Sequence, residues 1–168
     1  MLVKQVFKGR LLRLDVERRR FPNGYVGNLE VVTHPGAVLI VPVLGKDRVV
    51  MIRQYRPVIK SNIWELPAGT LGKGEATLSC AKRELAEETG YVARTWKKLG
   101  FIYPAPGYTT EKIIIYKATR LSKTRSDIQE DEVITPRILS KPALAKLLKA
   151  GRITDAKTIA ALSLARFV

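Results

Sequence analysis

The sequence predicts a mixed α/β (α+β) fold, and the distribution of apolar residues is the main reason. Residues 37–44 and 49–55 are continuous apolar runs, so at least one of them is expected to be a strand buried on both faces. Residues 111–119 contain an isoleucine-rich run and indicate a further core strand. Between these strands, helical spacing begins near Glu75 and stops at Gly90, a good left-handed terminator.

The first 32 residues are expected to form short β-strands. Residues 21–25 read Phe-Pro-Asn-Gly-Tyr, which is a strong turn signal because Pro, Asn and Gly favour tight turns. The single histidine, His34, follows at a joint, and we interpret it as structural. We therefore expect an N-terminal β segment at residues 1–33 and a main domain at residues 34–168.

Two arginines lie at the end of the second apolar run. The tripeptide at residues 45–47, Gly-Lys-Asp, separates the two runs and predicts a hairpin between them. Arg53 and Arg56 then follow where the second strand ends. A guanidinium group matches the geometry of a phosphate, so both are candidate phosphate ligands. The alternative is that one of them pairs with Glu65.

The helical segment carries glutamates beside its apolar side. Leu78, Ala81 and Leu85 have i, i+3, i+7 spacing, so this side should face the core. Three glutamates occupy an arc of about 100° next to it: Glu84, Glu87 and Glu88. Crowded carboxylates repel one another by a few tenths of a kcal/mol per pair, and a divalent cation would remove this repulsion. Hard oxygen ligands suit Mg²⁺ or Mn²⁺. A solvated glutamate-rich surface is the alternative interpretation.

The rest of the chain adds another strand and two helices. A strand is expected at residues 96–103, before a Pro-Ala-Pro-Gly break. Ser140 can cap a helix that runs to Lys149, and either Thr154 or Asp155 can cap a final helix. The lone cysteine in the glutamate-bearing helix is expected to pack or be partly buried, because nothing nearby marks it as a nucleophile.

Length and charge limit the possible classes of protein. The chain of 168 residues suits one domain, or one domain with a small appendage. Its net charge of +15 would attract polyanions, including nucleic acid or anionic lipid, but equally a small phosphate-rich substrate. Apolar runs fall short of about 18 residues, so we expect no membrane span. The single cysteine excludes an intramolecular disulfide and fits a reducing, cytoplasmic location.

The spacing around the helical segment resembles a known signature. Gly69 is followed after five residues by Glu75, and after seven more by the sequence RELAEETGY at residues 83–91. This pattern resembles the complete box of the Nudix hydrolase family. Tyr91 is the one departure, because the family usually has an aliphatic residue there.

Other segments are similar to the ADP-ribose pyrophosphatase branch of that family. Pro106 lies sixteen residues after Gly90, as in that branch. Four phrases also resemble it: RQYRP at 53–57, WELPAG at 64–69, PAPGYTTE at 104–111 and GRITDAKTIAAL at 151–162. The resemblance covers about residues 22–165.

The resemblance implies an α/β/α sandwich with a mixed sheet, plus a small N-terminal β domain. It implies a homodimer in which the N-terminal domains are exchanged, acting on a small nucleoside diphosphate sugar rather than on nucleic acid or membranes. Phe21 and Tyr25 would then grip adenine across the interface; plain hydrophobic packing is the alternative. The expected cofactor is Mg²⁺, for which Mn²⁺ may substitute.

The resemblance also implies roles for individual residues. Glu84, Glu88 and the carbonyl of Ala68 would hold the metal, with Glu87 assisting. Glu75 would either contribute through a water or pair with Arg83, and this pair would hold the helix carboxylates in position. The remaining substrate contacts would come from Arg53, Arg56, Glu65, Pro106 and Glu111. Glu132 is the expected general base, and Glu130 is the second choice.

The expected reaction is hydrolysis of ADP-ribose to AMP and ribose 5-phosphate. Rival substrates within the family are GDP-mannose, NADH and diadenosine polyphosphates, and a further rival is removal of pyrophosphate from RNA 5′ ends. A non-enzymatic nucleotide-binding module would be expected to lack box glutamates, and this chain keeps all of them.

Overall fold

The computed structural model describes residues 2–127 and 133–168. In this part of the chain ten strands and three helices follow one another. The strands are β1 (Leu2–Lys8), β2 (Arg13–Arg20), β3 (Val26–Thr33), β4 (Ala37–Leu44), β5 (Arg48–Arg56), β6 (Ser61–Glu65), β7 (Ala68–Thr70), β8 (Tyr91–Ile102), β9 (Ile113–Lys123) and β10 (Ile134–Ser140). The helices are α1 (Thr77–Thr89), α2 (Lys141–Lys149) and α3 (Ala156–Leu164).

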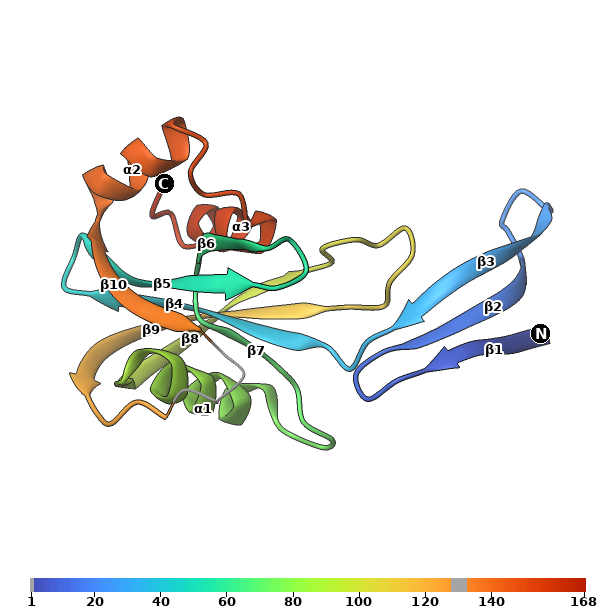
Figure 1. The fold of residues 1–168 in the computed structure, drawn as a ribbon, viewed down its shortest axis with the longest axis horizontal. Coiled ribbons are helices and arrows are strands. Elements are labelled where there is room, and N and C mark those ends of the chain that lie inside the picture. Colours follow the sequence, from blue (N-terminus) through green and yellow to red (C-terminus); the bar gives the residue numbers. More distant parts are fainter. Residues whose placement is uncertain (1, 128–132) are drawn as a thin grey trace.

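Strands β1, β2 and β3 form a separate antiparallel sheet. This N-terminal sheet projects away from the rest of the chain (Figure 1). The predicted turn at residues 21–25 is confirmed: the amide of Phe21 donates to the carbonyl of Tyr25 at 2.8 Å. Gly24 has a φ of +86°, a conformation that favours glycine at this position.

The main sheet has seven strands and is mixed. Its order is β10-β5-β4-β9-β8, with β6 paired to β5 and β7 paired to β4. Only β4 and β9 run parallel. The predicted hairpin of β4 and β5 forms, but the two strands pair only at residues 43–44 with 48–49. Beyond that point β4 pairs with β7 and β5 pairs with β6, so the sheet forks.

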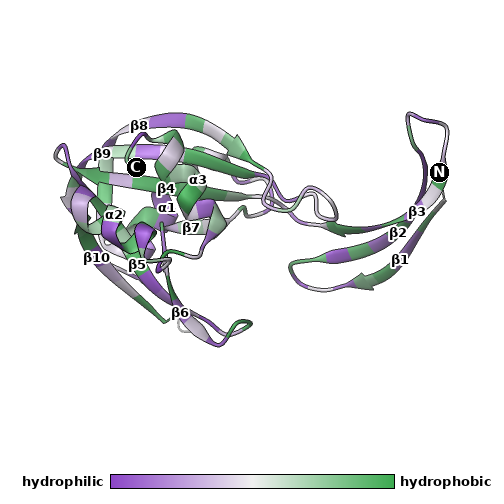
Figure 2. Ribbon diagram, turned by 90° about the horizontal axis from the view of Figure 1, so that it is seen from above, coloured by the Kyte–Doolittle hydropathy of each residue, from purple (hydrophilic) through white to green (hydrophobic). Residues whose placement is uncertain are grey.

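Helices cover both faces of the main sheet (Figure 1). One core joins alternate residues of β4 and β5, such as Val41 and Met51, to Leu144 of α2 and Leu162 of α3. The other core joins Val38 and Ile40 of β4 to the apolar side of α1. Figure 2 shows the apolar residues concentrated in this layered body, with a further apolar stretch on β1. The predicted fold class is therefore confirmed.

The helix ends follow the predicted signals. Gly90 ends α1 in the left-handed conformation, with φ 66° and ψ 31°. The side chain of Ser140 accepts a hydrogen bond from the amide of Ala143 and so caps α2. Asp155, rather than Thr154, caps α3 by accepting from the amide of Thr158.

The expectation that Leu78 faces the core was wrong, because 36% of its surface is exposed. The other two predicted positions, Ala81 and Leu85, are fully buried, and so is Cys80. The core-facing side of α1 therefore includes Cys80 in place of Leu78. Cys80 packs in the core, as expected, and burial raises the pKa of its thiol to about 12.

Candidate active site

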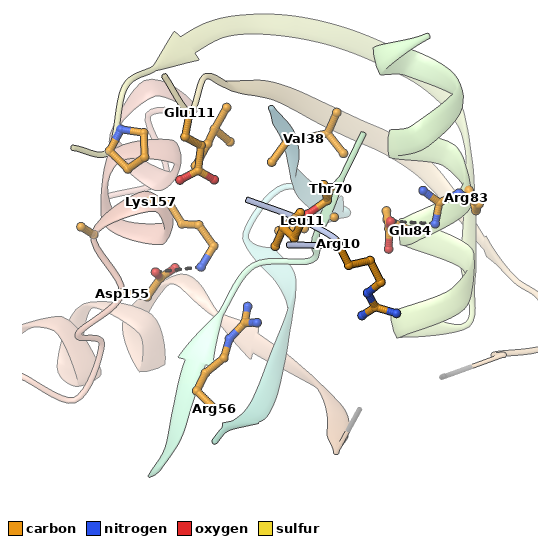
Figure 3. Close-up of a pocket in the computed structure, with 16 residues that line it drawn as sticks. Arg10, Leu11, Val38, Arg56, Thr70, Arg83, Glu84, Glu111, Asp155 and Lys157 are labelled. Atoms are coloured by element: carbon orange, nitrogen blue, oxygen red, sulfur yellow. Dashed lines mark hydrogen bonds and ion pairs between the residues drawn. The ribbon is translucent and has the colours of Figure 1, made fainter. Parts of the chain in front are cut away.

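A cavity of about 770 Å³ opens where β4 and β5 separate. Its walls come from the β1–β2 turn, from β7 and α1, and from the start of α3. Figure 3 shows acidic Glu84 with Arg83 on one side and basic Arg56 and Lys157 on the other. Glu84 thus faces Arg56 and Lys157 across the cavity, and each wall also carries a group of the opposite charge, Arg83 beside Glu84 and Asp155 beside Lys157.

Gly69 lets the backbone of β7 lie directly against Glu84. A Cβ atom at residue 69 would lie 1.9 Å from Oε1 of Glu84, which is far inside van der Waals contact. Only 7% of Glu84 and 2% of Glu88 is exposed, so both carboxylates are held largely out of solvent. The amide of Ala68 donates to Oε2 of Glu88 at 3.0 Å. These contacts bring together the predicted metal ligands Ala68, Glu84 and Glu88.

Arg83 holds three carboxylates of this wall. Its guanidinium lies 3.1 Å from Glu75, 2.7 Å from Glu84 and 2.9 Å from Glu87. The hydrogen bond from Arg83, helped by the amide of Gly72, lowers the pKa of Glu75 to about 2. The hydrogen bond to Glu75 and the neighbouring glutamates raise the pKa of Arg83. Arg83 therefore offsets the mutual repulsion of the carboxylates.

The donor set of this wall fits a divalent cation. Buried carboxylates and a backbone carbonyl beside a glycine are the hard oxygen donors that Mg²⁺ and Mn²⁺ prefer. In the part of the chain that the structure describes, no three acidic, histidine or cysteine side chains converge closely enough to hold a metal by themselves. The carbonyl of Ala68 is not a side chain, so it would supplement Glu84 and Glu88.

Arg56, Asp155 and Lys157 line the opposite wall, and the fully buried Glu65 pairs with two of them. Arg56 donates to Glu65 through two hydrogen bonds, Nε to Oε1 at 2.6 Å and Nη2 to Oε2 at 2.7 Å. Lys157 of α3 also pairs with Glu65, and its Nζ lies 2.8 Å from Asp155. Burial alone would raise the pKa of Glu65, but the hydrogen bond from Arg56 and the charge of Lys157 outweigh burial and lower it. Glu65 thus holds the two cationic side chains, Arg56 and Lys157, at the cavity.

Sequence reasoning missed three contributors to the cavity. Lys157 lines it from α3 and belongs to the phrase GRITDAKTIAAL. Arg10 and Leu11 line it from the β1–β2 turn. No motif marks these two residues, because their position depends on how the N-terminal sheet is attached to the main sheet.

Glu111 lines the cavity as expected, and its Oε1 lies 4.0 Å from Nδ1 of His34. The same nitrogen of His34 accepts a hydrogen bond from the amide of Gly36 at 3.0 Å. The amide of His34 in turn bonds to the hydroxyl of Thr110. His34 therefore holds the joint between the sheets, in agreement with its structural interpretation.

Other predicted site residues lie elsewhere. Arg53 stacks on Trp64, with 5.3 Å from its guanidinium carbon to the ring centroid. Phe21 and Tyr25 pack on each other, with ring centroids 5.6 Å apart, at the far turn of the N-terminal sheet. The cavity is lined by Pro104 but not by Pro106. The two candidate bases, Glu130 and Glu132, lie outside the described residues.

Comparison with known proteins gives consistent matches. The NUDIX domain matches residues 33–162. The ADP-ribose pyrophosphatase of Bacillus subtilis (strain 168) is 36% identical over 157 residues, which cover 92% of this chain and 85% of that protein. The methanol dehydrogenase activator of Bacillus methanolicus is 38% identical over 160 residues, covering 94% and 86%. A solved structure described as an ADP compounds hydrolase matches with a TM-score of 0.86 and 28% identity, covering 99% of this chain and 90% of that one.

None of the helices in the described residues has the length and apolar character needed to cross a membrane.

Proposed function

Because the chain belongs to the NUDIX domain family, we propose that it hydrolyses the pyrophosphate bond of ADP-ribose to AMP and ribose 5-phosphate. The observation that carries this proposal is the cavity in which the largely buried Glu84 faces Arg56 and Lys157, with the buried Glu88 one turn further along α1. The name of the Bacillus subtilis relative and the description of the solved structure support the substrate.

Divalent-metal dependence goes with this family, and we propose Mg²⁺, with Mn²⁺ as a substitute. Glu84, Glu88 and the Ala68 carbonyl would hold the metal, and Glu87 would assist. A bound divalent ion supplies charge neutralisation at the diphosphate and lowers the pKa of a coordinated water. Arg83 keeps the carboxylates oriented, because it pairs with three of them.

The wall that carries Arg56 and Lys157, which we call the basic wall, would bind the diphosphate. Arg56 and Lys157 are both anchored on Glu65, so their side chains need little further ordering when an anion arrives. Arg10, from the β1–β2 turn, adds a third cation that reaches the same cavity (Figure 3). Glu111 lines the same cavity, and we propose that it contacts the ribose.

A carboxylate must take the proton from the attacking water. We keep Glu132 as the proposed base and Glu130 as the second choice. Glu132→Gln should lower kcat far more than it changes KM. If Glu130→Gln does so instead, the two roles are reversed.

We also propose a homodimer that exchanges its N-terminal sheets, with the segment boundary at residues 33–34. Large apolar residues are exposed on that sheet, which supports burial against another chain. They include Val3, Val6, Phe7 and Tyr25. In that arrangement Phe21 and Tyr25 would reach the partner's adenine site. The cytoplasmic location stays a prediction.

The test is incubation of the purified chain with ADP-ribose and Mg²⁺, with AMP measured by chromatography. Parallel reactions contain GDP-mannose, NADH, a diadenosine polyphosphate or triphosphorylated RNA. AMP release at the highest kcat/KM of the panel supports the proposal. If another compound is turned over with a higher kcat/KM, that compound replaces ADP-ribose as the proposed substrate.

Glu88→Gln is the matched variant, because it removes charge while keeping shape. Its turnover should fall by about three orders of magnitude, in line with loss of a charged group at a preorganised site. We call the wall that carries Glu84 and Glu88 the acidic wall. Near-normal turnover by this variant would refute its assignment as the metal site.

A further inference from the structure

Gln54 is a buried polar residue that the site described above does not use. It lies near the end of β5, and only 4% of its surface is exposed. Its Oε1 has no hydrogen-bond partner among the residues that the structure describes. A buried amide oxygen without a partner lowers stability, so its presence in a packed strand requires an explanation.

Strand alternation shows which way Gln54 faces. Val49 and Met51 of β5 pack into the core shared with α2 and α3. Side chains alternate along a strand, so Ile52 and Gln54 belong to the opposite face of β5. That is the face covered by α1, which contacts both β5 and β10.

The buried acids of α1 lie on this same side of the sheet. Glu84 and Glu88 are the buried carboxylates of α1, and the Glu88 carboxylate reaches the amide of Ala68, close to the fork between β4 and β5. Arg56 shares the face of Gln54, two residues further along β5. Its pKa is raised first by the hydrogen bond to Glu65 and also by the charge of Glu88. This end of β5 is therefore within electrostatic reach of the acidic wall.

We infer that Gln54 is a cation-positioning residue of the acidic wall. Its Oε1 donates a lone pair to the divalent ion or to a water bound to that ion, so the oxygen gains a partner when the ion is present. Amide oxygens are ordinary ligands of hard divalent cations. A polar group that lowers the stability of the ligand-free protein is retained where it binds a ligand. The inference rests on the proposed function, because that function supplies the cation.

The test measures Mn²⁺ binding to the metal-free protein by electron paramagnetic resonance of free Mn²⁺, together with the melting temperature. Gln54→Met keeps the length of the side chain and removes the oxygen, whereas Gln54→Glu keeps an oxygen donor. Ile52→Met is the control for a change on the same face of the same strand. Glu88→Gln is the control for loss of a metal ligand.

We expect Gln54→Met to raise the Kd for Mn²⁺ by about tenfold or more, the size of effect that groups supporting a metal site produce. Its melting temperature should stay the same or rise, since an unsatisfied oxygen has been removed. Gln54→Glu should bind Mn²⁺ at least as tightly as the unchanged chain. Ile52→Met should leave the Kd unchanged.

Two results would overturn the inference. One is an unchanged Kd in Gln54→Met while Glu88→Gln loses binding, which would leave the proposed function standing. The other is a lower melting temperature in Gln54→Met, because it would show that the amide already has a partner in the fold. If the unchanged chain binds no Mn²⁺, the metal site of the proposed function fails as well.

Discussion

Gly69 shows how a single missing side chain determines the geometry of the acidic wall. Its backbone occupies the space beside Glu84 that any Cβ atom would fill. The sequence identified this glycine through the spacing of its motif, and the structure supplies the reason. Box residues could be predicted because their roles are set by local spacing. Lys157 and Arg10 could not, because they reach the cavity only through long-range packing.

Gly69→Ala should therefore displace the Glu84 carboxylate and disable the site. A misplacement of about 1 Å near reacting groups can lower turnover by about a hundredfold, and we expect a loss of that size in kcat. The measurement is steady-state hydrolysis of ADP-ribose with Mg²⁺.

Gly107→Ala is the control for this substitution. A Cβ atom at residue 107 meets no atom within 4 Å, so this variant should keep its activity. Equal activities of the two variants would show that the contact between residue 69 and Glu84 is unimportant.

At the scale of elements, Glu65 connects parts of the chain that are far apart in sequence. It lies at the end of β6, is fully buried, and pairs with Arg56 of β5 and Lys157 of α3. The sequence suggested an Arg–Glu pair here, but β6, β7 and β10 were not predicted. β7 has only three residues, too few for a reliable pattern, and β6 and β10 show mixed burial rather than regular alternation.

Glu65→Gln should lower the free energy of unfolding by about 1–3 kcal/mol near pH 7, the size of effect seen when a charged hydrogen-bond partner is removed. Arg56 is 39% exposed, so solvent offsets part of the loss. The measurement is urea denaturation of both proteins over a range of pH.

The pH dependence has a definite sign. The pKa of Glu65 in the folded chain lies below the ordinary value of 4.5. Its contribution is therefore complete above about pH 5 and disappears as the pH falls through the folded pKa. The stability difference between the two proteins should shrink on acidification; a difference that grows toward low pH would contradict the assignment.

At the scale of the whole molecule, the fold class and both ends of the chain followed from sequence patterns. Continuous apolar runs predicted β4, β5 and β9, and capping residues predicted the limits of α2 and the start of α3. The forking of β4 from β5 could not be predicted, because strand pairing depends on partners distant in sequence. It is this fork that opens the cavity.

The N-terminal sheet gives the prediction that belongs to this scale. Phe7 is 58% exposed there, and a second chain would bury it. Light scattering should give twice the chain mass for the unchanged protein, and Phe7→Asp should give the mass of one chain with reduced turnover.

Leu164→Asp provides the comparison, because Leu164 is 46% exposed on α3, away from the N-terminal sheet. This variant should keep the dimer. If the protein without substitutions stays monomeric at micromolar concentration, the exchanged dimer is excluded.

The ion pair between Glu65 and Lys157 has a consequence for how the protein is made. The lysine follows the glutamate by 92 residues, so β7 to β10 must all be synthesised before this side of the cavity can be completed. A polypeptide that is still growing on the ribosome can therefore hold an intact signature box while its cavity is unfinished.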